Sequence, residues 1–297
     1  MSVSTFNTPS RITVVLDLYA ADVRFAVSDR ADTIVEVQPS DPNKPADVKA
    51  AENTRVEYDE ASRTVSVVSR KPRNRFVNFS SKRPESIDLL IQLPTDSTVR
   101  GEADLGEFQS DGALGTVALK TDVGAIHLAE TGPLSVRSGV GKITVEDVSG
   151  TAEVHSSAGD IRLGAVDGTA EVSNGNGKVQ IGVITGAANI KSSNGPVSVE
   201  RALSDITAAS SNGEVRIGEV VRGRVSATSK NGSVEVGVRE GTAAWLELNT
   251  DVGRVYNELE SADAPTAGKP VDKVELRAGT KLGDVTIRRA PRLEDEA

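Results

Sequence analysis

The chain has 297 residues, a formal net charge of -9 and no Cys, and its aromatic content is only 3%. The absence of Cys excludes a disulfide framework, a thiolate nucleophile and Cys-ligated zinc. The acidic balance argues against general affinity for nucleic acid or for anionic membranes. Val is abundant, with 39 residues, and Gly contributes 27. The core must therefore consist of small, branched side chains, which favour strands.

The first 100 residues alternate apolar and polar side chains without a fixed period. Strand-like stretches occupy 11–20, 22–28, 32–38, 54–60, 63–69 and 86–94, and 46–53 is a candidate surface helix. An array of repeats needs its terminal unit covered, because an open edge recruits strands from other chains. Residues 1–100 therefore predict an irregular β-strand cap that is continuous with the rest of the chain.

A basic segment at 70–84 stands out inside this cap, because it contains no acidic residue. Its candidate partner-binding residues are Arg70, Lys71, Arg73, Arg75, Phe76, Phe79, Lys82 and Arg83. Basic groups interleaved with aromatic rings can hold phosphates and stack bases. The favoured interpretation is an exposed loop that balances the acidic body, and docking of a partner is the alternative.

A motif of Gly, any residue, aliphatic, polar and aliphatic recurs through the remainder. Its Gly residues stand at 106, 124, 141, 159, 177, 195, 213, 232, 253 and 283, so eight of nine spacings lie between 17 and 21. A second Gly column at 132, 150, 168 and 186 has the same period. One unit contains two short strands with period-2 alternation and a shorter third side, separated by Gly corners.

This repeat predicts the fold class, an all-β, single elongated β-solenoid of the parallel β-helix or β-roll type with about 18 residues per coil. Inward columns begin with Ile143 and Val145 on the first strand and with Ala152 and Val154 on the second. Identical residues stack, so side-chain amides are expected to bond along one column. That column consists of Asn176, Asn194, Asn212 and Asn231. A sandwich with regular hairpins is the less favoured alternative.

The repeat also suggests an organisation of the chain. We predict regular coils over 101–257, an insertion and a final coil over 258–289, and a polar tail over 290–297. The spacing within 242–253 places Leu246 and Leu248 in the inward column and Trp245 outward. An outward Trp at an irregular coil covers a bulge or, as the alternative, binds a partner.

These features resemble a known family. The strand SIDLLIQLPTDSTV (86–99), the S-N-G-x-V-x-V coils and the closing VGRVYNELE (252–260) are similar to a bacterial β-strand-repeat family of unknown function labelled "putative adhesin". The resemblance covers roughly residues 10–290 and rests on structural motifs. It implies a stalk or a binding surface at the cell envelope, and it implies no catalytic residues.

Two outward carboxylates are the weak catalytic candidates. Glu153 and Glu171 lie one period apart, and stacked coils separate them by about 4.8 Å, close to the spacing used by retaining glycosidases. The simpler interpretation is a solvated face. Asp is too sporadic at the corners for a calcium ladder. We expect no cofactor and no metal.

The leading hypothesis is a non-enzymatic binding or scaffold protein with a protein or glycan partner. One alternative is a polysaccharide-acting β-helix enzyme that uses the outward carboxylates. The other is a cytoplasmic regulatory or nucleic-acid-associated scaffold that uses residues 70–83, although nucleic acid is not the expected partner. No membrane insertion is expected. The start of the chain shows no signal peptide, which indicates the cytoplasm, whereas the resemblance indicates the cell envelope. The oligomeric state is left open.

Overall fold

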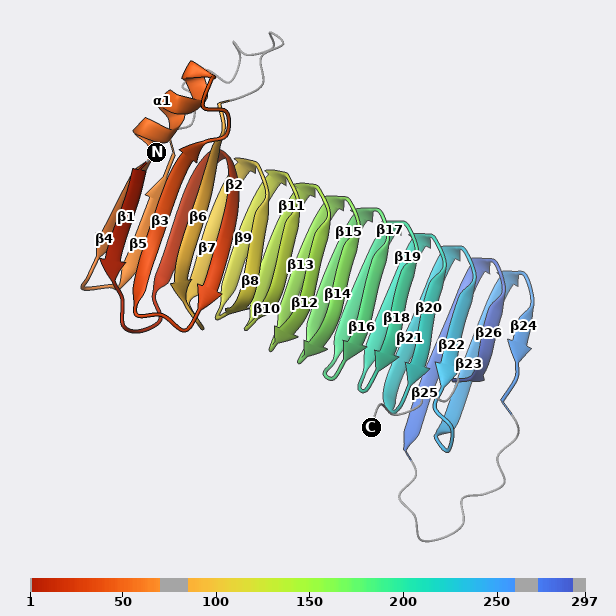
Figure 1. Cartoon of the computed structure of the whole chain (residues 1–297). Coiled ribbons are helices and arrows are strands. Elements are labelled where there is room, and N and C mark those ends of the chain that lie inside the picture. The colour runs from red at the N-terminus through yellow and green to blue at the C-terminus, as the bar shows by residue number, and fades with distance from the viewer. Residues whose placement is uncertain (1, 70–84, 260–271, 291–297) are drawn as a thin grey trace. The chain divides into compact units, whose positions relative to one another are not determined.

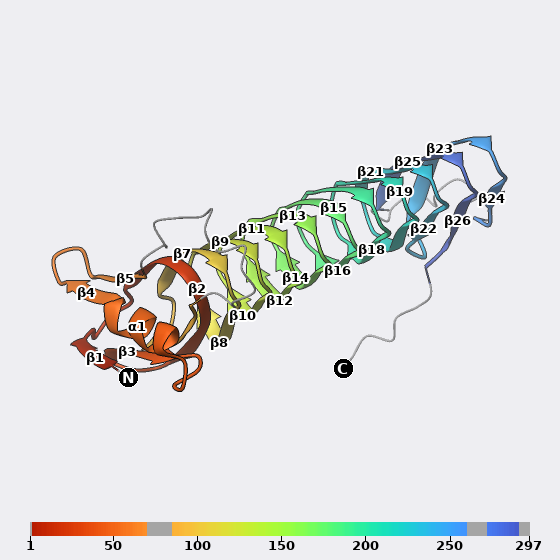
Figure 2. The ribbon, with the colours of Figure 1, turned by 90° about the horizontal axis from the view of Figure 1, so that it is seen from above.

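A computed structural model describes residues 2–69, 85–259 and 272–290. The chain divides into two compact units, residues 1–146 and 147–297. In both units short strands alternate between two sheets, here called sheet A and sheet B, whose buried faces meet (Figures 1 and 2). The all-β solenoid predicted from the repeat is therefore confirmed.

Unit 1 contains the irregular cap. Its elements are β1 (Ser2–Asn7), β2 (Thr13–Ser28), β3 (Asp32–Pro39), α1 (Pro45–Asn53), β4 (Arg55–Asp59), β5 (Thr64–Val68), β6 (Ile87–Pro94), β7 (Thr98–Leu105), β8 (Phe108–Leu114), β9 (Val117–Val123), β10 (Ile126–Thr131) and β11 (Leu134–Val140). Strand β12 (Ile143–Ser149) crosses the unit boundary. The pairs β1–β3, β3–β6 and β4–β5 are antiparallel, and the pairs that involve β2 and β7–β9 are parallel. The predicted helix is α1, which packs on β3 and β6.

Strand β2 organises unit 1, because it belongs to both sheets. Its first half pairs with β5 and β7 in sheet B, and its second half, from Ala21, pairs with β6 and β8 in sheet A. Phe25 and Phe108 face inward and are fully buried. The irregular part of the molecule thus uses aromatic rings in its core, whereas the buried apolar residues of unit 2 are all aliphatic.

Unit 2 contains the regular coils. Its remaining strands are β13 (Ala152–Ala158), β14 (Ile161–Asp167), β15 (Ala170–Asn176), β16 (Val179–Ile184), β17 (Ala188–Asn194), β18 (Val197–Ala202), β19 (Ile206–Asn212), β20 (Val215–Val220), β21 (Gly223–Asn231), β22 (Val234–Val238), β23 (Ala243–Val252), β24 (Val255–Asn257), β25 (Lys273–Leu282) and β26 (Val285–Arg289). Odd-numbered strands form sheet B and even-numbered strands form sheet A, and neighbouring strands within each sheet run parallel. The prediction of a shorter third side in each coil is wrong. Residues 156–158, for example, continue strand β13.

The corners of the coils require Gly. At Gly195 φ is +144°, and a Cβ there would lie 2.1 Å from the carbonyl oxygen of Gly177 on the neighbouring coil. The residue therefore needs both the left-handed conformation and the missing side chain. Close stacking of corner on corner is what holds the repeat to its fixed length.

The predicted amide column is confirmed. Asn194 donates from Nδ2 to Oδ1 of Asn176 at 2.9 Å, Asn212 donates to Asn194 at 2.8 Å, and Asn231 donates to Asn212 at 2.7 Å. The predicted inward columns are also buried; for example, Ile161 and Ala152 are both 0% exposed. The Asn side chains therefore satisfy one another's hydrogen-bonding groups along the stack.

A second polar column, which the sequence did not reveal, lies inside unit 2. Ser156, Ser192, Ser210, Ser229 and Thr280 are buried at the third inward position of sheet B. Ser210, Ser229 and Thr280 donate to carbonyl oxygens of corner glycines at 3.0, 2.8 and 2.8 Å. These bonds satisfy corner carbonyls that face the interior.

Asn174 interrupts this column. It occupies the same inward position and donates to the carbonyl oxygens of Gly159 and Gly177, both at 3.0 Å. By the pattern of its neighbours, Ser192 would donate to Gly177. Ser192 Oγ instead has no hydrogen-bond partner among the described residues. The Asn174 amide thus occupies the corner carbonyl oxygens of two coils, those of Gly159 and Gly177.

The last coil of the sequence is not the last coil of the stack. Strand β25 pairs with β21 on one side and with β23 on the other, and β26 lies likewise between β22 and β24. The inserted coil buries Leu276, Val285 and Ile287, while its neighbour places Asn257 opposite Ile287. This order buries the more apolar of the two coils on both sides.

Candidate functional site

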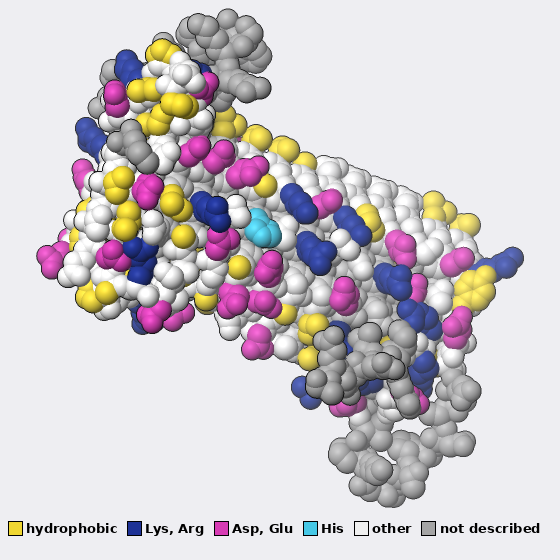
Figure 3. All heavy atoms as spheres, in the orientation of Figure 1, with side chains coloured by type: hydrophobic (Ala, Val, Ile, Leu, Met, Phe, Trp, Pro, Cys, Tyr) yellow, Lys and Arg dark blue, Asp and Glu magenta, His cyan; other side chains and the backbone are white. Residues whose placement is uncertain are grey.

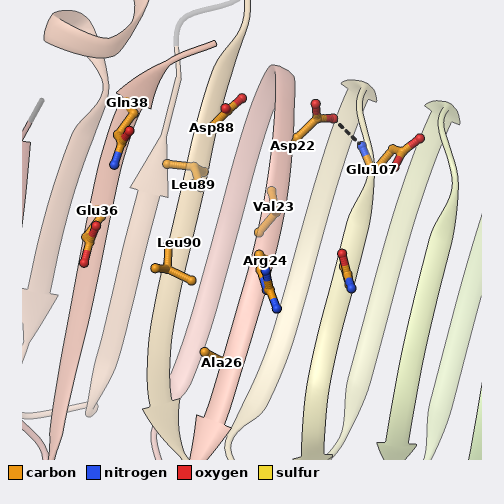
Figure 4. Close-up of a pocket in the computed structure, with 11 residues that line it drawn as sticks. Asp22, Val23, Arg24, Ala26, Glu36, Gln38, Asp88, Leu89, Leu90 and Glu107 are labelled. Carbon is orange, nitrogen blue, oxygen red and sulfur yellow. Dashed lines mark hydrogen bonds between the residues drawn. The ribbon is translucent and has the colours of Figure 1, made fainter.

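Three shallow grooves cross the outward faces of the sheets. The one on sheet A of unit 1 has a volume of about 550 Å³ and is rich in carboxylates (Figure 4). Asp22 lies opposite Asp88 on adjacent strands, and Oδ1 of Asp22 accepts the backbone N–H of Glu107 at 3.0 Å. Arg24, next to them, donates to Asp111 at 2.7 Å. This groove therefore carries an excess of negative charge.

A second groove, of about 560 Å³, lies on sheet B of unit 1. Its charges oppose one another across neighbouring strands. Glu102 lies opposite Lys120, with Oε2 to Nζ at 3.7 Å, and Asp17 lies opposite Glu102 on the other side. Three basic side chains (Arg100, Lys120, Arg137) and two acidic ones (Asp17, Glu102) line this groove, and cross-strand pairs of opposite charge such as Glu102 and Lys120 fix strand register.

The third and largest groove, the lysine groove, has a volume of about 700 Å³ and crosses sheet B of unit 2. We define it by its outward residues from six strands. They are Ser173, Lys191, Ser193, Ala209, Ser211, Thr228, Lys230, Gly279, Lys281, Asn249 and Asp251. One row runs in register through Ser173, Lys191, Ala209 and Thr228. The floor of the groove is hollow because Ser173, Ala209 and Thr228 have small side chains.

Strand period explains why these residues gather. Alternate residues of a strand share a face, so the inward positions Ser192 and Ser210 place Lys191, Ser193, Ala209 and Ser211 on the outside. Lys230 and Lys281 lie on neighbouring strands, each one residue after the paired Ser229 and Thr280. Two like charges therefore stand side by side. Over the face in view in Figure 3, basic and acidic side chains are interspersed.

The predicted carboxylate pair is in register. Glu153 lies directly opposite Glu171 on strands β13 and β15, as the 18-residue spacing indicated. His155 Nε2 lies 3.1 Å from Oε1 of Glu153. Neither Glu153 nor Glu171 lines any of the three grooves described above. Their catalytic role stays a prediction.

The other predicted partner-binding residues divide into two sets. Trp245 points outward on β23 with 57% of its surface exposed, while Leu246 and Leu248 align with the buried Leu276 and Ala278, as predicted. The basic cluster lies outside the described residues: Arg70, Lys71, Arg73, Arg75, Phe76, Phe79, Lys82 and Arg83. The sequence did not reveal the lysine groove, because the residue types along its rows change from coil to coil and two of its strands, β23 and β25, depart from the 18-residue period.

Within residues 2–69, 85–259 and 272–290, no group of three or more His, Cys, Asp or Glu side chains is placed to hold a metal ion. Nor does any helix in those ranges have the length and apolar character needed to span a bilayer.

The strand pairings define a two-sheet parallel β-solenoid. A family described as Toastrack DUF4097 matches residues 12–288, and the chain belongs to that family. The resemblance noted from the sequence is thereby confirmed.

The chain is also similar to several solved structures at low identity. A putative adhesin from Bacteroides fragilis is 12% identical over 96% of each chain, with a TM-score of 0.38. A putative adhesin from Parabacteroides merdae is 14% identical over 96% of this chain and 95% of that chain, with a TM-score of 0.37. A putative lipid binding protein from Parabacteroides distasonis is 13% identical over 98% and 96%, with a TM-score of 0.32. The comparison with curated proteins gave no match.

Proposed function

We propose that the protein is a non-enzymatic binding protein that holds an extended partner along the lysine groove. The observation that carries this proposal is the groove itself, which runs across six neighbouring strands and is open along its length. Strands in one sheet are about 4.8 Å apart, so six of them offer roughly 24 Å of contact. A partner with a repeating or extended backbone fits such a surface better than a compact small molecule does.

The rigidity of the surface supports binding. On β15, β17, β19, β21 and β25 each groove residue alternates with a buried one, and the Asn column and the Ser column fix strand ends by side-chain bonds. A rigid surface loses little conformational entropy when a partner binds. The proposed function includes no bond-breaking step. Glu153 and Glu171 then have a structural role or lie on a solvated face.

A filling variant tests the proposal. Ser211→Tyr places a ring in the groove, and Ser198→Tyr places the same ring on the outward face of sheet A. We expect the protein to bind one or more members of a panel of bacterial polysaccharides and host surface proteins. Ser211→Tyr should weaken that binding at least tenfold and Ser198→Tyr should leave it unchanged. Equal loss in both variants, or product release from any polysaccharide, would contradict the proposal.

We further propose a location at the cell envelope, which the resemblance implies. Cell fractionation with an antibody against the protein decides between this location and the cytosol. A purely cytosolic distribution would favour an intracellular scaffold instead.

A further inference from the structure

We propose that the lysine groove binds an acidic polysaccharide, a polymer whose sugars carry isolated carboxylates. This inference rests on the function proposed above and names the chemical class of the partner. Three features carry it: cations in the groove that have no anionic partner, a floor of small hydroxyl groups, and an exposed ring on the same face.

The first feature is the set of lysine side chains in the groove. Lys191, Lys230 and Lys281 are exposed and make no ion pair with any residue in the described ranges. Neighbouring arginines on the same sheet behave differently. Arg277 contacts Glu247 at 3.1 Å and Glu275 at 3.2 Å, and Arg224 lies 3.9 Å from Glu275. Asp251 faces Lys281, since the residues on either side of it pair with Thr280 and Leu282. Three lysines and one carboxylate leave the groove with a net charge of +2. This local excess, on a protein whose net charge is -9, favours an anionic ligand there.

The floor supplies the complementary chemistry for sugars. Ser173, Ser193, Ser211 and Thr228 present hydroxyl groups that both donate and accept hydrogen bonds, and Asn249 adds an amide. Sugar hydroxyls have the same dual capacity. Because Ala209 and Gly279 lie between these groups, the floor is low enough for a polymer to approach the hydroxyls.

The charge pattern favours spaced carboxylates over a phosphate polymer. Only lysines provide the positive charge of the groove, and none of its lining residues is an arginine, the side chain that matches phosphate by two parallel bonds. Asp251 lies in the same groove and, as a carboxylate, can only accept hydrogen bonds, and an ionised polyphosphate chain offers it no donor. A sugar hydroxyl can donate to Asp251 while carboxylates elsewhere along the chain meet the lysines.

Trp245 extends the surface. It lies on the outward face of β23, four residues before Asn249, which corresponds to about 13 Å along the strand. An exposed indole of this kind offers a flat apolar face with one N–H donor. The apolar face of a sugar ring can pack on it once the polymer leaves the groove along β23.

Binding of the full-length protein to defined polymers tests the inference. Biolayer interferometry uses polygalacturonate and alginate as uronate polymers, dextran as a neutral polymer, and polyphosphate and single-stranded poly-dT as phosphate polymers. The test variant carries Lys191→Gln, Lys230→Gln and Lys281→Gln. The control carries Lys142→Gln, Lys178→Gln and Lys273→Gln, three exposed lysines outside the groove lining, so both variants change the net charge equally.

We expect salt-sensitive binding to at least one uronate polymer, roughly tenfold weaker in the test variant because three exposed charge contacts are lost, and unchanged in the control. Tighter binding to polyphosphate or poly-dT would overturn the inference in favour of a phosphate polymer. Binding to dextran that the test variant retains would overturn it while leaving the binding function intact. If Ser211→Tyr abolishes binding to a protein from the panel and no uronate polymer binds, the function stands and the polysaccharide class fails.

Discussion

Unit 1 and unit 2 build the same two-sheet coil by different means. Unit 2 stacks coils of nearly constant length, so one residue type recurs in each column, as the Asn column from Asn176 to Asn231 shows. Unit 1 relies on single features instead: β2 spans both sheets, Phe25 and Phe108 fill the core, and the buried Asp47 fixes α1. The difference shows that repetition lets side chains such as those of the Asn column bond to one another coil after coil, whereas in the irregular coils a buried polar group such as Asp47 has individual partners.

Asp47 illustrates the individual case. It is 2% exposed, its Oδ1 lies 2.8 Å from Lys44 Nζ, and the same oxygen accepts the backbone N–H of Ser86 at 3.1 Å. Burial alone raises the pKa of this carboxyl, but the bonds from Lys44 and Ser86 outweigh burial and lower its pKa. No neighbouring coil carries a copy of this carboxylate, so nothing compensates for its removal.

The largest expected effect is at a corner of unit 2. Gly195→Ala should lower the free energy of unfolding by about 3 kcal/mol, because the new Cβ meets a backbone carbonyl in a left-handed conformation. Urea denaturation measures the loss, and hydrogen exchange should show it in β15, β17 and β19.

Gly241→Ala is the matched control. Gly241 also has a positive φ, +81°, but nothing lies within 4 Å of a Cβ placed there. Its substitution should cost only about 1 kcal/mol, the conformational part alone. If both substitutions cost the same, close stacking of the corners does not hold the repeat.

The next effect is in unit 1. Asp47→Asn should lower the free energy of unfolding at pH 7 by about 2 kcal/mol, because a buried charge-assisted contact is lost. The folded pKa of Asp47 lies below its unfolded value, so its contribution is present above the unfolded pKa and disappears as the pH falls through the folded pKa.

Thermal unfolding from pH 7 to pH 3 measures this dependence. The wild-type protein should lose more stability over that range than Asp47→Asn does, so the difference between the two should shrink as the pH falls. Parallel pH profiles would show that Asp47 does not stabilise the cap through its charge.

The smallest effect compares two members of the buried Ser column. Ser210 donates to Gly195 at 3.0 Å, whereas Ser192 has no partner among the described residues. Ser210→Ala should therefore cost about 1 kcal/mol, and Ser192→Ala should be neutral or slightly stabilising. Urea midpoints separate the two, and a loss at Ser192 equal to that at Ser210 would refute the role assigned to Asn174.

The sequence by itself determined the repetitive features. A fixed period places identical residues on stacked coils, so the inward columns, the Asn column, the outward Trp245 and the facing pair Glu153 and Glu171 all follow from spacing. Helix α1 followed as well, since it stands between strand-like segments. These features depend only on neighbours that the period itself identifies.

The tertiary structure decided what the period leaves open. The insertion of β25 between β21 and β23, the two-sheet path of β2 and the sharing of acceptors by Asn174 depend on which arrangement buries more apolar surface and satisfies more polar groups. The lysine groove belongs to the same class: Lys230 and Lys281 are 51 residues apart in sequence, and they become neighbours only because the final coil enters the stack beside β21. Burial of that coil, a property of the whole unit, therefore creates the surface to which we assign function.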